Sequence, residues 1–505
     1  MTLDANRSDL VFGLVGTGAM GRGIAQIAAA SGCTVILVDS RPGAAAEARD
    51  YVAKMLARLA EKGKLSPDAL LRATEGLKVG TSMADLGACH VVVEAIVEDI
   101  AVKQALMREL ESIVSETCLI ASNTSSLSVT SIAAACRLPG RVGGFHFFNP
   151  VPLMKVVEVI DGIMTEAWVG EALTTLARRM GHTPVKAKDT PGFIVNHAGR
   201  GYGTEALKLV GEGVADFPAV DRVLREAAGF RMGPFELLDL TALDVSHPVM
   251  ESIYDQYYQE PRFRPSPITR QRLSAGLLGR KTGRGFYVYD GDKAIVSAPP
   301  PPPTTRPDTV WVAPGDGWAP VATLAAKLGG IVEAGERPST RALCVVAPLG
   351  EDCTSAAVRL GLDPHRTVAV DPLFGQDSHR TIMTNPLTEA KWSDAALGLF
   401  SCDGKPTTLI KDSPGFIAQR VVATIVNIGC DIAQQRIATP DDIDRAVTLG
   451  LGYPTGPLAW GDRLGADKVL TVLNAMLTMT GDPRYRPSLW LKRRALLGVS
   501  LLTGE

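Results

Sequence analysis

A glycine-rich turn near the amino terminus places the strongest constraint on how this chain can fold. The run GTGAMG, which contains Gly16, Gly18 and Gly21, follows a strand-like segment at 11–15 and opens a helix-like segment at 19–31. In such a unit the first glycine permits a tight turn, the second lets a pyrophosphate approach the backbone, and the third lets helix and strand pack closely. The pattern predicts a dinucleotide-binding βαβ unit; the alternative is a glycine turn that only caps the helix.

Strand-like and helix-like segments alternate beyond this turn. Apolar strand-like runs occur at 34–38, 90–95, 118–122, 141–148 and 155–160, with helical stretches between the earlier ones. Such alternation is typical of a mostly parallel sheet with helices on both faces. From Pro191 to about Tyr289 the pattern becomes helical and the strand signals fade. We therefore expect an α/β Rossmann-type doubly wound domain followed by an all-α helical domain.

The end of the second predicted strand indicates which dinucleotide binds. Asp39 lies there, 18 residues after Gly21. A carboxylate at this place accepts hydrogen bonds from the adenosine ribose hydroxyls and repels an added phosphate. This favours NAD over NADP as the cofactor, although Arg41 nearby keeps NADP as an alternative. The predicted cofactor-binding residues of this region are Gly16, Gly18, Ala19, Met20, Gly21 and Asp39.

A histidine and a glutamate twelve residues apart are the candidate catalytic pair. His146 lies in GGFHFFNPVPLMKVVEVI, and Glu158 lies on the next strand-like run, after the PVP turn. An apolar setting makes an unpaired carboxylate costly, so Glu158 needs a partner. A glutamate bonded to one ring nitrogen would fix the histidine tautomer and stabilise the imidazolium when the other nitrogen takes a proton. Hydride chemistry on an alcohol requires such a base. The alternative is a structural ion pair between strands.

Polar residues at two other places could complete the site. Asn123, Ser125 and Ser126 lie in IASNTSSLS, where a strand ends and a helix begins. Strand carboxyl ends face the ligand crevice of a doubly wound sheet, but serine is also an ordinary helix N-cap residue, so both interpretations stay open. Asn196, in PGFIVNH, begins the helical domain. It could reach across the cleft, although taken alone it favours a structural role.

The second half of the chain repeats the first. KDTPGFI at 188–194 recurs as KDSPGFI at 411–417, and TEA at 165–167 recurs at 388–390, in both cases 223 residues later. A constant offset along such a stretch indicates duplication.

The second copy lacks the residues that would carry chemistry. It contains no GxGxxG, and at the same offset Ala369, Thr381 and Gln419 replace the histidine, the glutamate and the asparagine of the first copy. His365 and Asp377 are also twelve residues apart, but they lie out of register, so we do not expect them to form a site. The second copy is expected to be chemically silent.

A proline-rich run separates the two halves. Five consecutive prolines, Pro299–Pro303, cannot pack as a helix or a central strand and are expected to be extended and exposed. The predicted division of the chain is an NAD-binding Rossmann domain at 8–188, a helical domain at 189–290, a proline-rich linker at 291–308, a degenerate, shortened Rossmann-like region at 309–408 and a second helical domain at 409–505.

Composition argues against several classes of partner. With a formal net charge of −2 and no long apolar run, the chain is not expected to bind nucleic acid or a membrane. Eight cysteines without CxxC spacing and seven histidines without metal-ligand spacing give no support for disulfides or a metal site. We expect a cytoplasmic protein with buried, reduced thiols and no metal.

Seven motifs, in this order along the chain, resemble the L-3-hydroxyacyl-CoA dehydrogenase family. They are GTGAMG, VVVEAIVE, SNTSSL, FHFFNPVPLMKVVEV, KDTPGFIVN, MGPFELLD and GRKTGRGFYVY. The resemblance covers about residues 10–289, and the second half resembles a further, degenerate copy of the family's helical domain. The two-copy layout is similar to the long bacterial form of phenylacetate catabolism, which acts on 3-hydroxyadipyl-CoA. The resemblance implies NAD-dependent oxidation of the C3 hydroxyl of a 3-hydroxyacyl-CoA.

The resemblance also implies roles for individual residues. His146 would be the general base and Glu158 its partner, while Ser125 and Asn196 would bind oxygens of the acyl-CoA thioester substrate. Asn149 would help to position cofactor or substrate. The remaining implied contacts are Glu98, Lys103 and Asn123 for NAD, and Lys62 for the phosphates of CoA.

Some positions depart from the family's motifs. His197 stands where the family usually has arginine, and Met55 replaces a polar residue that contacts CoA in relatives. Arg200 lies in a GRG run that replaces the usual apolar continuation, and Arg231 stands where GYPMGP would supply proline. An extra cation near the acyl pocket would suit a substrate with a terminal carboxylate, so Arg200 and Arg231 are candidates for its recognition.

Three other functions remain as alternatives. One is a general short-chain 3-hydroxybutyryl-CoA dehydrogenase, and another is a hydroxy-acid or sugar-acid dehydrogenase on the same fold, which would have no use for Lys62. A non-catalytic NAD-binding protein is the third, and the intact candidate catalytic residues argue against it.

Single-copy members of the family pair through their helical domains. We therefore expect the two copies to pair within one chain, with a homodimer through these domains as the alternative.

Overall fold

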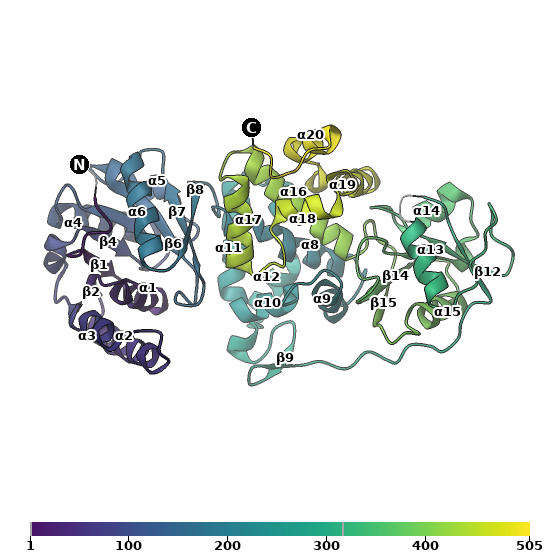
Figure 1. Cartoon of the computed structure of the whole chain (residues 1–505), viewed down its shortest axis with the longest axis horizontal. Coiled ribbons are helices and arrows are strands. Elements are labelled where there is room, and N and C mark those ends of the chain that lie inside the picture. The colour runs from purple at the N-terminus through teal and green to yellow at the C-terminus, as the bar shows by residue number, and fades with distance from the viewer. Residues whose placement is uncertain (1–2, 316–317, 505) are drawn as a thin grey trace. The chain divides into compact units, whose positions relative to one another are not determined.

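The computed structural model describes residues 3–315 and 318–504, whose elements are labelled in Figure 1. The chain divides into two compact units. The first unit contains the chain up to His197 together with 435–451 and Gly504, and the second contains 198–434 and 452–503. Among the described residues, no helix is long and apolar enough to cross a membrane.

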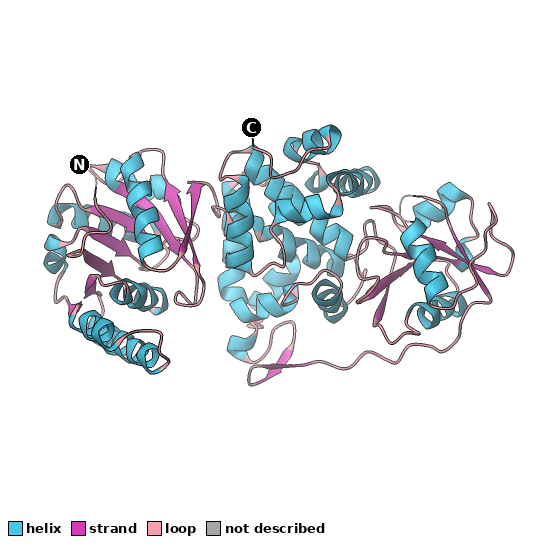
Figure 2. Ribbon diagram, in the orientation of Figure 1, coloured by secondary structure: helices cyan, strands magenta, loops and turns pink. Residues whose placement is uncertain are grey.

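An eight-stranded sheet forms the centre of the first unit (Figure 2). The strand order is β3-β2-β1-β4-β5-β6-β7-β8, and every neighbouring pair is parallel except β6 and β7, which are antiparallel. The strands are β1 (Val11–Val15), β2 (Thr34–Val38), β3 (Leu77–Val79), β4 (Val91–Glu94), β5 (Leu119–Ser122), β6 (Val142–Phe147), β7 (Val156–Asp161) and β8 (Thr183–Lys188). The mostly parallel, doubly wound domain predicted from the sequence is confirmed.

Apolar helices bury both faces of this sheet. In β4, Val91 and Val93 belong to a core cluster shared with α1 and α6, whereas Val92 belongs to a second cluster shared with α4. Since successive strand residues point to opposite faces, a continuous apolar run is what a strand covered on both sides requires. The helices of the first unit are α1 (Ala19–Ala30), α2 (Ala44–Glu61), α3 (Pro67–Glu75), α4 (Ile100–Ile113), α5 (Val129–Ala133), α6 (Ala167–Arg179), α7 (Val195–Ala198) and α17 (Pro440–Leu451).

The last strand of the sheet is covered by a distant segment of the chain. β8 was not expected, because its sequence TPVKAK lacks an apolar run. It pairs in parallel with β7, and the backbone N–H of Lys188 donates to Ile437 O at 2.9 Å, just before α17. A segment of the second half thus completes the edge of the first sheet.

A five-stranded sheet in the second unit reproduces part of the first sheet. Its order is β11-β12-β13-β14-β15, and only the β13–β14 pair is antiparallel. The same antiparallel step occurs between β6 and β7, so β11–β15 correspond to β4–β8. Within the described part of the second copy, up to residue 315 and from 318 to 504, no strands correspond to β1–β3. The elements are β11 (Thr309–Val312), α13 (Trp318–Lys327), β12 (Ala342–Val346), α14 (Cys353–Leu360), β13 (Thr367–Val370), β14 (Arg380–Thr384), α15 (Ala390–Phe400) and β15 (Thr407–Ile410).

The two helical regions pack against each other within the second unit. Their elements are α8 (Arg200–Gly211), α9 (Phe217–Glu226), α10 (Pro234–Thr241), α11 (Leu243–Gln256), α12 (Pro267–Ser274), a hairpin of β9 (Val288–Asp290) and β10 (Lys293–Ile295), α16 (Ala418–Gln434), α18 (Pro457–Leu464), α19 (Ala466–Thr480) and α20 (Leu489–Leu497). Helix α8 lies against α16, its counterpart in the repeat. A Cβ added to Gly201 would lie 3.0 Å from Cδ1 of Ile428, a tight contact, so this crossing favours a small residue.

A buried ionic cluster joins α8 to the second copy. The carboxylate of Glu205 is fully buried and accepts from Arg420 and, at 3.0 Å, from Arg484. Burial acts to raise the pKa of Glu205, but the two guanidinium groups outweigh it and lower the pKa to about 2. The hydrogen bond between Lys188 and Ile437 has an equivalent in the opposite direction. The backbone N–H of Lys411, after β15, donates to Val214 O at 3.0 Å, just before α9. Each copy therefore covers a surface of the other.

Truncation after Tyr289 tests whether the two copies cover each other's apolar surfaces. The fragment loses α16 and α17, and so exposes the apolar face of α8, the unpaired carboxylate of Glu205 and the edge of β8. We expect it to aggregate, or to form a dimer in which α9 of a second fragment takes the place of α17. Light scattering coupled to gel filtration measures this, and a stable, monodisperse monomer would refute the expectation.

Candidate active site

The three glycines of the first turn meet three different geometric demands. Gly16 has φ +90°, and a Cβ there would lie 2.7 Å from Ala95 O. A Cβ on Gly21 would collide with Gly16 O. A Cβ on Gly18, in contrast, would meet nothing within 4 Å. The first glycine therefore makes the turn and the third lets α1 approach β1, while the second leaves its backbone open to a ligand.

A cavity of about 700 Å³ lies beside this turn, at the carboxyl ends of β1, β2 and β4. It is lined by Gly16–Gly18, Asp39, Ser40 and Ala95–Val97, among others. Helix α1 begins at this place with no side-chain cap and no acidic residue in its first turn, so its N-terminal N–H groups remain available to an anion. The open backbone, the helix end and the carboxylate of Asp39 fit the pyrophosphate and ribose of a dinucleotide.

Asp39 is held in place by the glycine turn itself. Its Oδ2 accepts from Thr17 N and Thr17 Oγ1, both at 2.7 Å, and its Oδ1 accepts from Arg41 N at 2.9 Å. Partial burial acts to raise the pKa of Asp39, but these hydrogen bonds hold it below its usual value. The guanidinium of Arg41 is bonded to both oxygens of Glu47 instead, at 3.1 and 2.5 Å.

His146 and Glu158 lie directly opposite each other on the antiparallel strands β6 and β7. Nδ1 of His146 is 2.6 Å from Oε2 of Glu158, and the two side chains are 5 % and 0 % exposed. A carboxylate accepts only, so Nδ1 carries the proton and Nε2 offers a lone pair. Nε2 makes no hydrogen bond within residues 3–315 and 318–504. The arrangement supplies one oriented proton acceptor.

The second oxygen of Glu158 fixes the turn that leads to Asn196. Oε1 accepts from Ile194 N at 2.9 Å and from Val195 N at 2.8 Å. The turn places Phe193, a non-glycine residue, at φ +48°, and the two hydrogen bonds compensate for this conformation. One buried carboxylate thus positions both the histidine and the beginning of α7.

Asn196 is connected in turn to the loop after β5. Its Nδ2 donates to Ser125 O at 3.2 Å. The same loop donates to Oε1 of Glu98 from Ser125 N at 2.8 Å and from Thr124 Oγ1 at 2.7 Å. Asn123 Oδ1 accepts from Phe147 N, beside His146, at 2.9 Å. The structure therefore brings the four predicted catalytic residues into one hydrogen-bonded network, with Asn123 and Glu98 at its margin.

Lys103 is fully buried, and carboxylates surround its ammonium group. Its Nζ lies 2.8 Å from both oxygens of Glu94 and 3.5 Å from Oε2 of Glu98. Glu94, which also accepts from Ser122 Oγ, was missed in the sequence. The signal was present in VVVE, because a carboxylate that ends a buried strand needs a cation. Lys103 thus holds Glu98, and through it the loop of Ser125.

Two predicted site residues are not joined to this network. Asn149 is exposed and precedes the cis peptide bond to Pro150. Lys62 is exposed at the C-terminal end of α2. Their roles as contacts of cofactor, substrate or CoA stay predictions.

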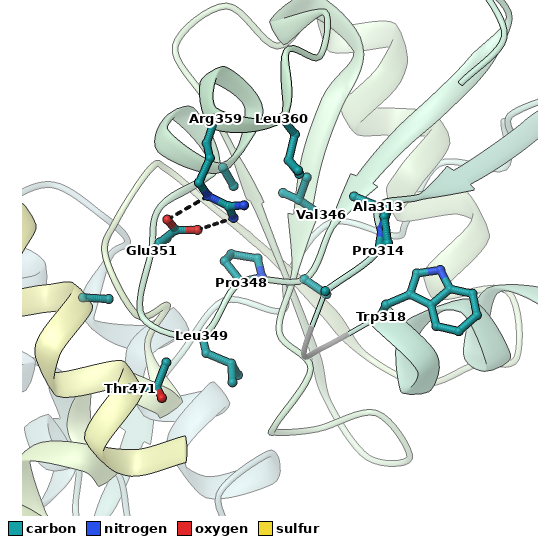
Figure 3. A pocket seen from close by; sticks show the side chains of 14 residues that line it. Ala313, Pro314, Trp318, Val346, Pro348, Leu349, Glu351, Arg359, Leu360 and Thr471 are labelled. Carbon is teal, nitrogen blue, oxygen red and sulfur yellow. Dashed lines mark hydrogen bonds and ion pairs between the residues drawn. The ribbon is translucent and has the colours of Figure 1, made fainter. Parts of the chain in front are cut away.

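The second copy keeps the strands but not the polar groups. Ala369 lies opposite Met383 on the β13–β14 pair, so Thr381 is not even its partner in register. Gln419 donates to the buried Asp371 at 2.9 Å. A smaller cavity of about 340 Å³ lies at the ends of β11 and β12 (Figure 3). There Val346, Ala347, Pro348 and Leu349 stand at the repeat positions of the NTSS run at 123–126.

The other candidate groups of the second copy do not form a site. The His365 ring lies 3.8 Å from Glu389, and Asp377, which is 90 % exposed, lies 3.8 Å from Lys327. Within residues 3–315 and 318–504, no cluster of three or more His, Cys, Asp or Glu side chains could hold a metal ion. All eight cysteines are free, and Cys402, contrary to the expectation of buried thiols, is exposed.

Comparisons with known proteins agree with this geometry. The family model "3-hydroxyacyl-CoA dehydrogenase, NAD binding domain" matches residues 11–190, and "3-hydroxyacyl-CoA dehydrogenase, C-terminal domain" matches 192–289 and again 415–500. The chain is 36 % identical to 3-hydroxyadipyl-CoA dehydrogenase of Escherichia coli K12 over 96 % of its length and 97 % of the relative.

Shorter and structural relatives give the same assignment. The crystal structure of a 3-hydroxybutyryl-CoA dehydrogenase from E. coli K12 superposes with a TM-score of 0.86 and 34 % identity, covering 97 % of this chain and 98 % of that one. The mitochondrial hydroxyacyl-coenzyme A dehydrogenase of Sus scrofa is 39 % identical over 55 % of this chain and 90 % of its own length. With an intact NAD-binding domain and both C-terminal copies matched, the chain is an NAD-dependent dehydrogenase and belongs to the 3-hydroxyacyl-CoA dehydrogenase family.

Proposed function

We propose that this protein oxidises the C3 hydroxyl of an L-3-hydroxyacyl-CoA to the 3-oxoacyl-CoA, with 3-hydroxyadipyl-CoA as its preferred substrate. The observation that supports the reaction is the buried His146–Glu158 pair, joined through the Ile194–Val195 backbone to Asn196 and Ser125.

Each catalytic side chain has a defined task in this reaction. Nε2 of His146 accepts the proton of the C3 hydroxyl while hydride leaves C3 and the carbon–oxygen double bond forms. The carboxylate of Glu158 stabilises the imidazolium that results, because its oxygen already lies 2.6 Å from Nδ1. NAD, when bound, accepts the hydride. In the reverse direction the imidazolium returns the proton to the developing alkoxide.

The remaining site residues position substrate and cofactor. Ser125 and Asn196 hold oxygens of the thioester substrate, and Asn123 and Asn149 help to place the nicotinamide end of the cofactor. The ammonium group of Lys103 is paired with the carboxylates of Glu94 and Glu98. Glu98 and Lys103 therefore act indirectly, by holding the loop that contains Ser125. The exposed Lys62 contacts the phosphates of CoA, whose charge an ammonium complements.

The preference for a dicarboxylyl substrate is supported by one of the long relatives. The E. coli protein that shares this length is a 3-hydroxyadipyl-CoA dehydrogenase, whereas the long E. coli crystal structure is described as a 3-hydroxybutyryl-CoA dehydrogenase. The second candidate function is therefore a general short-chain dehydrogenase, and a direct substrate comparison distinguishes the two.

The chain layout supports pairing within one polypeptide. We propose that the helical domain near 189–290 pairs with the second one near 409–505, as α8 and α16 do. This intrachain pairing takes the place of a homodimer through the helical domains.

We also propose a cytoplasmic location for the protein, where NAD and acyl-CoA thioesters are both available.

Replacement of Glu158 by glutamine tests the proposed pair. The glutamine oxygen can still accept from Ile194 N and Val195 N, but its NH2 group donates to Nδ1 of His146 and drives the proton onto Nε2. We expect kcat to fall by about 10³–10⁴-fold, the cost of a wrong histidine tautomer, with NADH affinity and melting temperature nearly unchanged. Thr381→Val, the matched change in the second copy, should leave kcat within about threefold. Equal losses in both variants would contradict the assignment.

Neutralising Asp39 tests the choice of cofactor. Asp39→Asn keeps an oxygen for Thr17 but removes the charge that repels a ribose phosphate. A charge-assisted hydrogen bond contributes about 1.5–3 kcal/mol, so the ratio of kcat/KM with NAD⁺ to that with NADP⁺ should fall about 10–100-fold. Arg41→Ala serves as the control, because its guanidinium is bonded to Glu47. A wild-type enzyme that prefers NADP⁺ would overturn the prediction.

A comparison of two acyl-CoA substrates tests the preference for a dicarboxylyl chain. Oxidation of NADH is followed with 3-oxoadipyl-CoA and with acetoacetyl-CoA, and kcat/KM is compared. We expect a preference of about 100-fold for the dicarboxylyl thioester, equivalent to about 2.7 kcal/mol. Comparable values would favour the general short-chain function, and no turnover of either thioester would reject the reaction.

A further inference from the structure

A cation lies next to the carboxylate that fits the ribose of the cofactor. Arg41 follows Asp39 by two residues, just beyond the carboxyl end of β2, and its backbone N–H donates to Asp39 Oδ1 at 2.9 Å. Asp39 and Ser40 line the cavity beside the glycine turn. In dinucleotide-binding folds a carboxylate here binds the ribose hydroxyls of NAD, whereas a nearby arginine accommodates the 2′-phosphate of NADP. Within three residues the chain therefore carries groups suited to either cofactor.

The guanidinium of Arg41 is held by a carboxylate of the following helix. Its Nη1 and Nη2 donate to Oε1 and Oε2 of Glu47 at 3.1 and 2.5 Å. Two parallel bonds of this kind are the strong, geometrically specific form of an arginine–carboxylate pair. The hydrogen bonds and charge of Glu47 raise the pKa of Arg41, and the charge of Asp39 adds to this effect. Two carboxylates therefore act on one cation, and the group as a whole is negative.

The loop between β2 and α2 makes this contact a local one. Helix α2 begins at Ala44, directly after Gly43, whose φ of +82° is a left-handed conformation that glycine adopts without strain. The N–H of Ala44 donates to Arg41 O at 3.2 Å and closes the turn. Glu47 then lies in the first turn of α2, only six residues after Arg41. Because the segment is short, little loop entropy is lost in forming the pair.

Both side chains of the pair are open to solvent. Arg41 is 61 % exposed and Glu47 is 66 % exposed. Solvent and salt weaken such a pair, so a competing anion could displace the carboxylate. A phosphate that did so would also meet the negative charge of Glu47 itself. Glu47 is therefore expected to change cofactor selection several-fold rather than by orders of magnitude.

We propose that Glu47 contributes to the selection of NAD over NADP, by holding the guanidinium of Arg41 and by adding a second negative charge near Asp39. Asp39 repels a ribose phosphate, and Glu47 withholds the attraction that Arg41 would otherwise supply. The inference concerns the cofactor and not the acyl chain, so it does not depend on the proposed preference for 3-hydroxyadipyl-CoA.

Calorimetric titration of the full-length protein with NADH and with NADPH tests the proposal. In Glu47→Ala the ratio of the Kd for NADPH to the Kd for NADH should fall about 5–10-fold, mainly through tighter binding of NADPH. In the double variant Arg41→Ala/Glu47→Ala most of this fall should disappear, because the released cation is gone. All of these positions are exposed, so the variants are expected to fold.

A matched control lies on the same helix. Arg49 donates from Nε and Nη2 to Oδ1 of Asp50, at 2.9 and 2.7 Å. Asp50→Ala therefore removes one negative charge and releases one arginine of α2, as Glu47→Ala does, and should leave the Kd ratio within about twofold.

Three results would overturn the proposal. An unchanged ratio in Glu47→Ala would show that the pair has no part in cofactor selection. A fall that persists in full in Arg41→Ala/Glu47→Ala would leave charge repulsion alone and reject the role of Arg41. Equal falls in Glu47→Ala and Asp50→Ala would show a general effect of net charge instead of a specific contact.

Discussion

The buried carboxylate of Glu158 is the group on which the rest of the site depends. A fully desolvated charge is tolerated only if both oxygens are satisfied, and here His146 takes one oxygen while Ile194 N and Val195 N take the other. The same group therefore fixes a side chain on the sheet and a backbone turn at the start of a helix. Removing one partner of such a cluster costs about 3–5 kcal/mol, which makes its geometry rigid as well as chemically useful.

The second copy shows what remains when this carboxylate is lost. Its turn before α16 keeps the same backbone, with Phe416 at φ +51° where Phe193 has φ +48°, but Thr381 has replaced the glutamate. The GxGxxG sequence is missing as well, and the described residues of the second copy contain no counterpart of β1–β3. The second copy retains the surfaces that pack against the first copy: α16 covers α8, and α17 covers β8. It has become a scaffold for the first copy.

Much of this could be predicted from local sequence patterns. Glycine spacing and strand–helix alternation were sufficient for the doubly wound sheet, and a buried glutamate near a histidine was sufficient for the candidate pair. Other features depend on distant residues. β8 has no apolar pattern and is a strand because Ile437 and α17 cover it, and Lys103 is recognisable as an internal ion-pair residue only once Glu94 and Glu98 lie beside it. These contacts join residues that are far apart in the sequence, so no local pattern of residue types predicts them.

The central claim is that one chain holds one active site, built in the first copy and only supported by the second. Calorimetric titration of the full-length protein with NADH measures this directly. The account predicts one binding site per chain, weakened about 10–100-fold by Asp39→Asn and unaffected by Thr381→Val. Two sites of comparable affinity on each chain would contradict it, because the second copy would then bind a dinucleotide without a glycine turn.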